Sequence, residues 1–382
     1  MKYKRTISLL KKLSILVFVS CSSRIDSNIV YSESSGGTPD TDTFFYGADL
    51  SYVNEMEDCG ATYKDSDNNV KDVYEIFKDE GANLVRYRLW HNPTWTNYSN
   101  LEDVKKSIQR AKNKNFKVLL DFHYSDTWTD PGQQQIPAAW LPELNNTSEL
   151  AQLLYQYTYD VLKELNNENL TPDIVQIGNE INPMILQDGS IVWPIDWERN
   201  TTLINKGIKA VRDISNEIDK KIEVMLHIAQ PENGLWWFEE ATQNGITDFD
   251  WMGLSYYPEF SDYTLENIGE AITDLISTHN RKLMIVETGY PFTLDDADSA
   301  NNLLSSSSLT DGIVASNQGQ LEYLNSLTSK IKEAGGLGIV YWEPAWVSTN
   351  CNTLWATGSH WDNATLFDRN GKVNLGIKFY NP

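Results

Sequence analysis

The sequence predicts a single (β/α)8 TIM barrel with long loops after its strands. Eight short apolar runs recur along the chain, and most segments between them have the spacing of amphipathic helices. The runs are almost continuously apolar, which is typical of parallel strands buried on both faces. Polar residues collect at the carboxyl end of nearly every run. Eight such units in about 340 residues fit one barrel domain in the α/β class.

The first 43 residues are predicted to lie outside the barrel. Residues 1–21 combine a basic start with a short apolar run and end at Cys21, a pattern typical of an export signal. The small Ser20 before Cys21 favours a lipoprotein signal, with lipidation at Cys21. Residues 22–43 are rich in Ser, Thr, Gly and Asp and are predicted to be a flexible tether. Residues 44–382 are predicted to form the barrel domain that carries the site.

A lipid on Cys21 would attach the protein to a membrane without spanning it. We therefore expect an exported lipoprotein of the bacterial cell surface or outer membrane. A periplasmic or secreted protein is the alternative, and it would follow from cleavage of a plain signal near Cys21. We expect the protein to be a monomer.

The composition limits the class of ligand. The formal net charge is −22 at pH 7, which argues against nucleic acid and other polyanions because they would be repelled. The chain has 13 Trp and 19 Tyr, and many of them stand where loops are expected. Aromatic faces stack on sugar rings, and a neutral sugar avoids the repulsion. The composition therefore favours a carbohydrate cleft, with filling of a large core as the alternative use of these side chains.

The elements can be placed in order along the chain. The apolar runs predict strands over residues 43–52, 83–90, 116–124, 173–180, 221–229, 249–257, 281–290 and 337–344. Helical spacing predicts helices over residues 70–82, 101–115, 148–165, 201–218 and 318–336. Active sites of such barrels lie at the carboxyl ends of the strands. The polar and aromatic residues at these ends are Asp49, Arg86, Arg88, His123, Asn179, Glu180, His227, Tyr256, Tyr257, Glu287, Trp342 and Glu343.

Two glutamates stand out among these residues. Glu180, in the segment "DIVQIGNEINP", ends the fourth predicted strand, and Glu287, in "LMIVETGYP", ends the seventh. Strands four and seven face each other across an eight-stranded barrel. Two facing carboxyl groups are what hydrolysis of a glycosidic bond requires, and a separation of roughly 5–5.5 Å would retain the anomeric configuration. The alternative for each glutamate is a buried salt bridge with Arg86 or Arg88.

The neighbours of the two glutamates suggest their roles. Asn179 can donate a hydrogen bond from its amide to a sugar 2-hydroxyl in the transition state. Glu180, beside it, is expected to be the acid/base, with a pKa raised by the charge of Glu287. Glu287 is expected to be the ionised nucleophile, helped by Arg86 and the hydroxyl of Tyr257.

The two histidines at strand ends allow several interpretations. His123 and His227 could contact the substrate, contact a carboxylate, or be satisfied core residues. A metal hydrolase is disfavoured because no third ligand has a recognisable spacing. The residues predicted to bind substrate are Asp49, Arg86, His123, Trp128, Asp130, Asn179, His227, Trp236, Trp237, Tyr257, Trp342 and Trp346.

Six segments of the chain together point to one family. They are "GADLSYVNEME", "VRYRLWHNP", "DFHYSDTWTDPGQQQIPAAW", "QIGNEINPMI", "GLSYYP" and "VETGYP". These segments resemble those of the arabinogalactan endo-β-1,4-galactanases, a family of retaining (β/α)8 glycosidases. The resemblance implies endo cleavage of internal β-1,4-galactosidic bonds in pectic galactan, with Glu180 as proton donor and Glu287 as nucleophile. The alternatives are another retaining β-glycanase, acting on mannan, xylan or glucan, and a non-catalytic surface lipoprotein that binds glycans.

An acidic segment follows the seventh predicted strand. In "LDDADSANN" the side chains of Asp296, Asp298 and Asn302 offer oxygen ligands on a tight loop, which suits a structural Ca²⁺. The resemblance implies a Ca²⁺ shared with a Ser-x-x-Asp in the eighth loop, here Ser359 and Asp362. Bacterial members of the family carry a His where Ala300 stands in this chain. An acidic helix cap is the alternative, and no cofactor is expected for the chemistry itself.

Cys59 and Cys351 are predicted to form a disulfide. Cys59 follows the first predicted strand and Cys351 follows the eighth. These strands are neighbours in a closed barrel, so both cysteines emerge at the same rim, and cysteines of an exported protein tend to pair. The bond would hold the long eighth loop.

Overall fold

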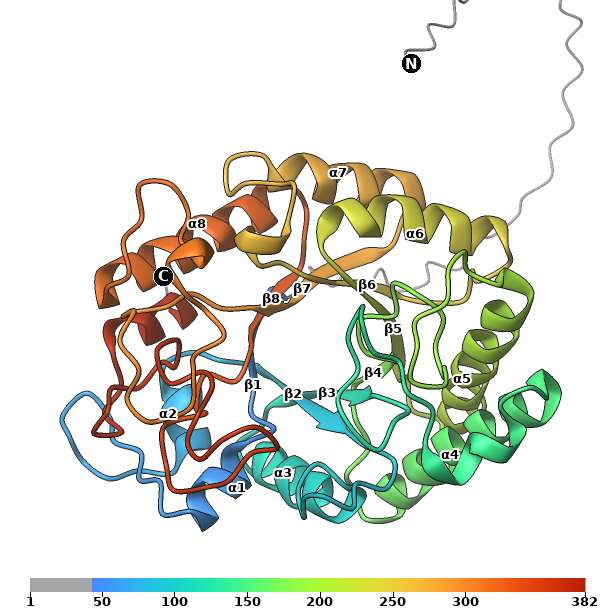
Figure 1. The fold of residues 1–382 in the computed structure, drawn as a ribbon, viewed down its shortest axis with the longest axis horizontal. Coiled ribbons are helices and arrows are strands. Elements are labelled where there is room, and N and C mark those ends of the chain that lie inside the picture. The colour runs from blue at the N-terminus through green and yellow to red at the C-terminus, as the bar shows by residue number, and fades with distance from the viewer. Residues whose placement is uncertain (1–42, 382) are drawn as a thin grey trace, which may run out of the picture. The chain divides into compact units, whose positions relative to one another are not determined.

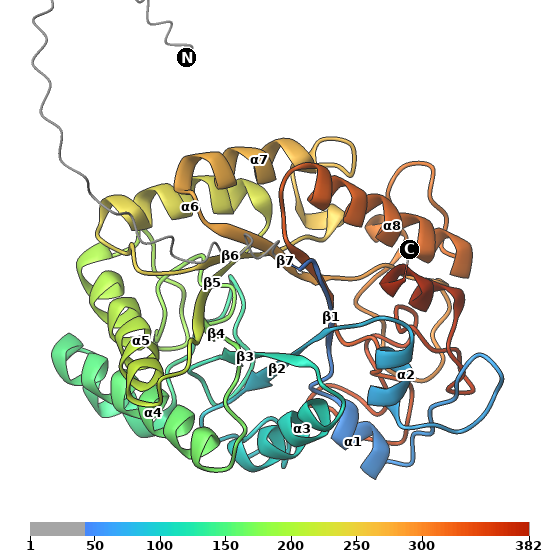
Figure 2. The ribbon, with the colours of Figure 1, turned by 180° about the vertical axis from the view of Figure 1, so that it is seen from behind.

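The computed structural model describes residues 43–381. The predicted export signal, Cys21 and nearly all of the tether lie outside the described residues. The strands form one closed parallel barrel in the order of the sequence, ringed by helices (Figure 1, Figure 2). This confirms the predicted (β/α)8 fold. The strands are β1 (Phe45–Asp49), β2 (Leu84–Leu89), β3 (Lys117–Phe122), β4 (Ile174–Ile177), β5 (Glu223–Ala229), β6 (Trp251–Ser255), β7 (Lys282–Thr288) and β8 (Gly338–Tyr341).

Five of the eight described α-helices begin at a polar side chain that accepts from a backbone N–H of the first turn. Asn100 caps α3 by accepting from the Asp103 N–H, and Ser316 caps α8 by accepting from the Gly319 N–H. Among the described residues, no helix is long and apolar enough to cross a membrane. The helices are α1 (Val53–Asp58), α2 (Val73–Asp79), α3 (Leu101–Asn113), α4 (Thr147–Asn167), α5 (Trp197–Glu217), α6 (Pro231–Gln243), α7 (Ile268–His279) and α8 (Asn317–Glu333).

The eighth unit differs from the other seven. The long segment after β8 ends in the short 3-10 helix η4 (Leu375–Tyr380), which packs against α8 where the other units place the α-helix that follows their strand. The hydroxyl of Tyr380 donates to the carbonyl of Gly47 in β1 at 3.2 Å. The loop after β8 is therefore free to cover the mouth of the barrel, while η4 closes the ring of helices.

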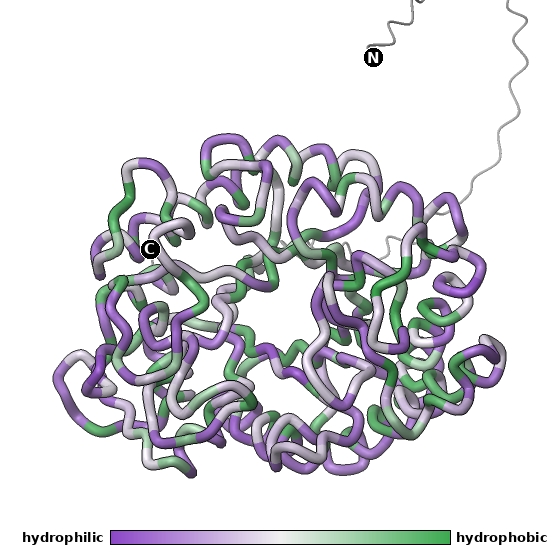
Figure 3. The backbone as a smooth tube through the Cα atoms, viewed as in Figure 1, coloured by the Kyte–Doolittle hydropathy of each residue, from purple (hydrophilic) through white to green (hydrophobic). Residues whose placement is uncertain are grey.

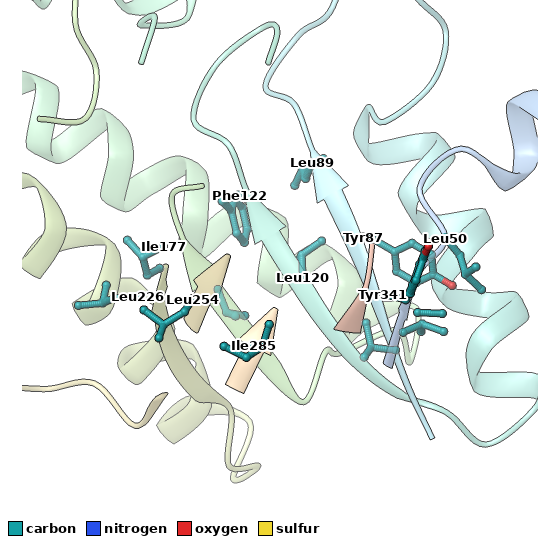
Figure 4. Packing of buried hydrophobic residues seen from close by; sticks show 14 of the residues in the cluster. Leu50, Tyr87, Leu89, Leu120, Phe122, Ile177, Leu226, Leu254, Ile285 and Tyr341 are labelled. Atoms are coloured by element: carbon teal, nitrogen blue, oxygen red, sulfur yellow. The ribbon is translucent and has the colours of Figure 1, made fainter. Parts of the chain in front are cut away.

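The core has two layers separated by the strands. The outer layer lies between strands and helices, and Figure 4 shows part of it around Leu120, Phe122 and Ile177. Hydrophobic residues follow the strands and alternate with hydrophilic ones along the helices (Figure 3). The inner layer fills the barrel with Leu84, Leu119, Ile174, Met225, Trp251, Met284, Val286 and Val340.

The inward-facing positions change from apolar to polar along β3 and β4. Successive residues of a strand point to opposite faces, so residues two apart share a face. In β3, Leu119 belongs to the inner apolar layer, and Asp121 lies two positions further along. In β4, Ile174 and Gln176 repeat the pattern, and Asp121 pairs with Gln176 in the sheet. The barrel thus has an apolar floor and a polar mouth.

The predicted disulfide is present. Cys59 directly follows α1, and Cys351 lies in the long loop after β8. The two Cα atoms are 5.6 Å apart and the sulfurs are bonded. Because β1 and β8 are neighbours, a bond that spans 292 positions in sequence closes a short distance in space.

Candidate active site

A cleft of about 1040 Å³ lies at the carboxyl ends of the strands. This volume is at the upper end of the range for small-molecule sites, which suits a ligand of several sugar units. Glu180 and Glu287 both line it, as the sequence predicts. The predicted substrate-binding residues that line it with them are Arg86, His123, Trp128, Asp130, Asn179, Tyr257, Trp342 and Trp346.

Glu180 lies in the turn that follows β4. The strand ends at Ile177, three residues before the predicted end, because Gly178 takes a φ of 83° and turns the chain. A Cβ at Gly178 would lie 2.5 Å from a methyl carbon of Ile181, so this turn requires glycine. Glu180 itself has a φ of 46°, in the left-handed region that non-glycine residues rarely adopt. Such strain is characteristic of functional sites.

The surroundings of Glu180 suit a proton donor. Burial raises its pKa to about 7, and the charges of Asp130 and Asp121 act in the same direction. A hydrogen bond from the Ser255 hydroxyl, 2.5 Å from Oε1, opposes the rise. The sequence-based expectation named the charge of Glu287 as the cause, and burial replaces it as the main one. A carboxyl group with a pKa near 7 can donate and accept a proton at neutral pH.

Glu287 is held by an arginine. It is the second-last residue of β7, and its Oε1 lies 2.8 Å from Nη1 of Arg86. Burial and the charge of Glu180 raise the pKa of Glu287, whereas the guanidinium opposes this rise. Two facing carboxyl groups titrate as a pair. Since the arginine contacts Glu287 and not Glu180, the proton of the pair belongs on Glu180 and the charge on Glu287.

Arg86 is the centre of the polar mouth. Its Nη1 also lies 2.8 Å from Asp49, and its Nη2 lies 2.8 Å from Asp121 and 2.7 Å from Oδ1 of Asn179. Its Nε donates to Oε1 of Gln176 at 3.3 Å. The salt bridge considered as an alternative role for Glu287 therefore exists, and it forms part of the site.

A second arginine supports the aromatic wall of the cleft. The guanidinium of Arg88 lies 4.2 Å from the ring centre of Trp128, and it also faces Tyr52 and Trp90. Oε1 of Glu343 forms a salt bridge with Nη1 of Arg88 at 3.0 Å. This buried pair fixes one wall of the cleft.

The same wall continues with two tryptophans from the segment after β8. The ring of Trp342 lies 6.2 Å from that of Trp128 and meets the ring of Trp361 edge to face, with centres 4.8 Å apart. A Cβ at Gly289 would lie 2.3 Å from the ring of Trp361, so the glycine allows this ring to pack beside the end of β7, which carries Glu287.

Four residues predicted to bind substrate lie outside the cleft, and three of them are completely buried. Asp49, His227 and Trp237 each have no exposed surface, so direct contact with a ligand is ruled out for them. Asp49 forms a salt bridge with Arg86. Trp237 packs in the outer core, and because consecutive residues of a helix point about 100° apart, the residue beside it faces another way. Its neighbour Trp236 stays partly exposed but does not line the cleft.

Three residues that were not predicted from the sequence contact the site from the buried interior of the barrel. Asp121, Gln176 and Ser255 are completely buried, and each bonds to a residue of the mouth. A signal for two of them was available, because a single Asp or Gln interrupts an otherwise apolar strand. Ser255 has no such signal, since a serine is common at the end of a strand.

The five residues predicted to bind calcium come together between the loops after β7 and β8. Nδ2 of Asn302 donates to Asp296 at 2.7 Å and to Asp362 at 3.1 Å, and Asp298 accepts from the Ser359 N–H at 2.8 Å. The residue types fit Ca²⁺. The orientation of Asn302 does not, because its nitrogen faces the carboxylates. Within residues 43–381, no three His, Cys, Asp or Glu side chains form a group that could hold a metal ion.

The fold and the two glutamates together define a glycoside hydrolase. The sequence profile of glycosyl hydrolase family 53 matches residues 45–380, and the chain belongs to this family. It is 54% identical to the arabinogalactan endo-beta-1,4-galactanase of Cellvibrio japonicus over 340 residues, which cover 88% of this chain and 90% of that protein. It is 33% identical to the endo-beta-1,4-galactanase of Bacillus subtilis, over 86% of this chain and 83% of that one.

Solved structures agree with this assignment. The family 53 catalytic domain of Ignisphaera aggregans superposes with a TM-score of 0.81 at 32% identity, covering 88% of this chain and 95% of the other. One of two fungal beta-1,4-galactanases superposes with a TM-score of 0.75 at 30% identity, covering 88% and 98%.

Proposed function

We propose that this family 53 hydrolase cleaves internal β-1,4-galactosidic bonds of galactan and arabinogalactan with retention of configuration. The observation that carries the proposal is the pair of Glu180 and Glu287 at the mouth of the barrel, in a cleft lined by tryptophans. The relatives named above act on the same linkage according to their names. A neutral polysaccharide also suits a chain with a net charge of −22.

The geometry supports a double displacement. In the first step the Glu287 carboxylate attacks the anomeric carbon, the glycosidic bond breaks, and Glu180 gives its proton to the leaving oxygen. In the second step Glu180 takes a proton from water, the water oxygen bonds to the anomeric carbon, and Glu287 leaves as a carboxylate. Arg86 stabilises the charge on Glu287 before and after the covalent step.

A digestion time course on linear β-1,4-galactan tests the substrate and the endo action together. We expect an early fall in viscosity and a ladder of oligosaccharides, with no release of reducing sugar from mannan, xylan or β-glucan. Cleavage of one of those polymers in preference to galactan would favour another retaining β-glycanase. Binding of galactan without cleavage would favour the glycan-binding alternative.

We propose further that the mature protein is a monomer attached to the bacterial outer membrane through lipidated Cys21. The support is the basic and apolar start of the chain, which ends at that cysteine. Fractionation of cells that express the wild type and Cys21→Ala tests it. The wild type is expected with the membranes and the variant in the soluble fraction, whereas soluble wild type would support a periplasmic or secreted protein.

We also propose a structural Ca²⁺ between the loops after β7 and β8. The first support is the set of side-chain oxygens, which suits Ca²⁺. The second is the raised pKa of Asp362, which is caused mainly by burial and further by the charges of Asp298 and Asp296. A cation would relieve that repulsion. Chelation is expected to lower the melting temperature and added Ca²⁺ to restore it. An unchanged melting temperature would mean that no metal is bound and that the hydrogen bonds from Asn302 to Asp296 and Asp362 hold the two loops together.

A further inference from the structure

Ser255 and His227 form a hydrogen-bonded chain that ends on the acid/base. Ser255 is the last residue of β6, and its hydroxyl donates to Oε1 of Glu180 at 2.5 Å. Nε2 of His227, on β5, lies 2.8 Å from the same hydroxyl oxygen. Both residues are completely buried, and neither lines the cleft. Their side chains reach the two catalytic-site residues Glu180 and Asn179 and are too deep to touch a substrate.

The direction of this chain follows from the groups around the other nitrogen of His227. Nδ1 lies 3.1 Å from Nε2 of Gln176 and 3.4 Å from the backbone N–H of Glu180, which can only donate. The amide of Gln176 is oriented by Arg86, which donates to its Oε1. Two donors therefore point at Nδ1, which must carry the lone pair of the imidazole.

One acceptor also lies near Nδ1, which is Oδ1 of Asn179 at 3.0 Å, and it accepts from Nη2 of Arg86 at 2.7 Å. The backbone N–H of Glu180 outweighs this contact in the assignment because its direction is fixed and it can only donate. Burial and the charge of Arg86 also lower the pKa of His227 well below its ordinary value, so the ring is neutral and has one N–H. That N–H is on Nε2 and donates to Ser255.

We infer that Ser255 and His227 are positioning residues for the acid/base. The Nε2–H of His227 donates to the Ser255 oxygen, so the hydroxyl hydrogen of Ser255 points at the carboxylate of Glu180. This hydrogen bond sets how readily Glu180 releases its proton in the first step and takes one back in the second. The inference rests on the proposed role of Glu180.

The same geometry predicts the direction of a pH effect. A hydrogen bond to the charged form of a carboxyl group lowers its pKa, and the Ser255 hydroxyl acts in this way on Glu180. The other polar groups near Glu180 stay in place when the hydroxyl is removed. They are Arg86 on β2, Asp121 on β3, Asp130 in the loop after β3, His227 on β5, Tyr257 after β6 and Glu287 on β7.

The test is the pH profile of kcat/KM on linear β-1,4-galactan for the wild type and Ser255→Ala. The alkaline limb requires protonated Glu180 and is expected to move up by about one pH unit in the variant. His227→Ala frees the Ser255 hydroxyl to rotate and is expected to move the limb in the same direction by less. Ser107→Ala, which removes a buried hydroxyl on α3 that bonds to Asn54, is the control and should leave the limb unchanged.

A second substrate separates a failure of the inference about Ser255 from a failure of the proposed role of Glu180. A dinitrophenyl β-galactobioside has a leaving group that needs no acid, so its kcat/KM should lack the alkaline limb in wild type and variant alike. A limb that persists on this substrate would overturn the proposed role of Glu180. A limb on galactan that does not move in Ser255→Ala would overturn the inference alone.

Nitrogen-15 NMR of the wild-type histidines tests the tautomer without any variant. We expect the proton of His227 on Nε2, with Nδ1 unprotonated, throughout the active pH range. A proton on Nδ1 would reverse the direction of the chain and overturn the inference.

Discussion

Glu180 and Glu287 are the same residue type in the same cleft, and their neighbours give them different protonation states. Glu287 has a guanidinium at 2.8 Å, whereas within residues 43–381 the carboxyl group of Glu180 accepts from the neutral hydroxyl of Ser255 alone. Burial acts on both and raises both pKa values. The arginine therefore decides which of the two keeps the proton, and with it which residue is the acid and which is the nucleophile.

Glu180→Gln is expected to reduce kcat on galactan by about 10²–10⁴-fold, the usual contribution of a general acid. The loss in the first step should be much smaller on a dinitrophenyl galactobioside, because its leaving group departs without protonation. Steady-state and burst kinetics on the two substrates check this. Glu239→Gln, at an exposed position on α6, is the control. Equal losses on both substrates would contradict the acid/base role.

The raised pKa of Glu180 also predicts a pH-dependent stability. The folded-state pKa of about 7 lies above the ordinary value of 4.5, so the unfolded chain loses this proton at lower pH. The stability of the wild type therefore falls as pH rises between these two values, and Glu180→Gln removes the fall. Relative to the wild type, the variant should gain about 3 kcal/mol between about pH 4.5 and about pH 8. Urea unfolding at each pH checks this, and a difference that does not change with pH would refute it.

At the residue scale, the residues that line the cleft were easier to predict from the sequence than the buried residues that hydrogen-bond to them. Glu180 and Glu287 follow from the rule that chemistry lies at strand ends. Ser255 and Gln176 act on these groups only through hydrogen bonds between different strands. No local pattern encodes such bonds, because they depend on the register of the closed barrel.

At the element scale, the loop after β8 is the part of the barrel that most needs support. It carries Trp346 and Trp361 into the cleft, and no α-helix follows it directly. Its ties are the disulfide to Cys59 and hydrogen bonds to the loop after β7, including one from Asn302 to Asp362.

Removing the disulfide with Cys59→Ser and Cys351→Ser is expected to destabilise the protein by about 3–5 kcal/mol, because the bond closes a long loop of the unfolded chain. The variant should also bind galactan more weakly, since the tryptophan wall loses its anchor. Thermal unfolding and KM on galactan measure the two effects. An unchanged melting temperature would show that the hydrogen bonds to the loop after β7 suffice.

The elements were predictable to different degrees. All eight strands lie within the predicted ranges, because burial on both faces leaves continuous apolar runs. Helices α6 and α7 have no counterpart among the helices predicted from spacing. The 3-10 helix η4 in the eighth unit was missed because the periodicity of α-helices does not describe so short an element.

At the scale of the whole molecule, charge and aromatic content predicted the class of ligand before any fold was known. A net charge of −22 disfavours anionic polymers, and five of the 13 tryptophans line the cleft at the carboxyl ends of the strands. The closed order of the strands brings β4 and β7 to opposite sides of the mouth. The site is therefore a consequence of topology as much as of the residues that form it.

If Glu180 and Glu287 cleave galactan by two displacements at the same carbon, the anomeric configuration is retained. Proton NMR of the anomeric signals during hydrolysis of a β-1,4-galactooligosaccharide measures this outcome. The new reducing end is expected first as the β anomer, and it should reach the α/β equilibrium only later, by mutarotation. First appearance of the α anomer would mean a single displacement by water and would contradict the assignment of Glu287 as the nucleophile.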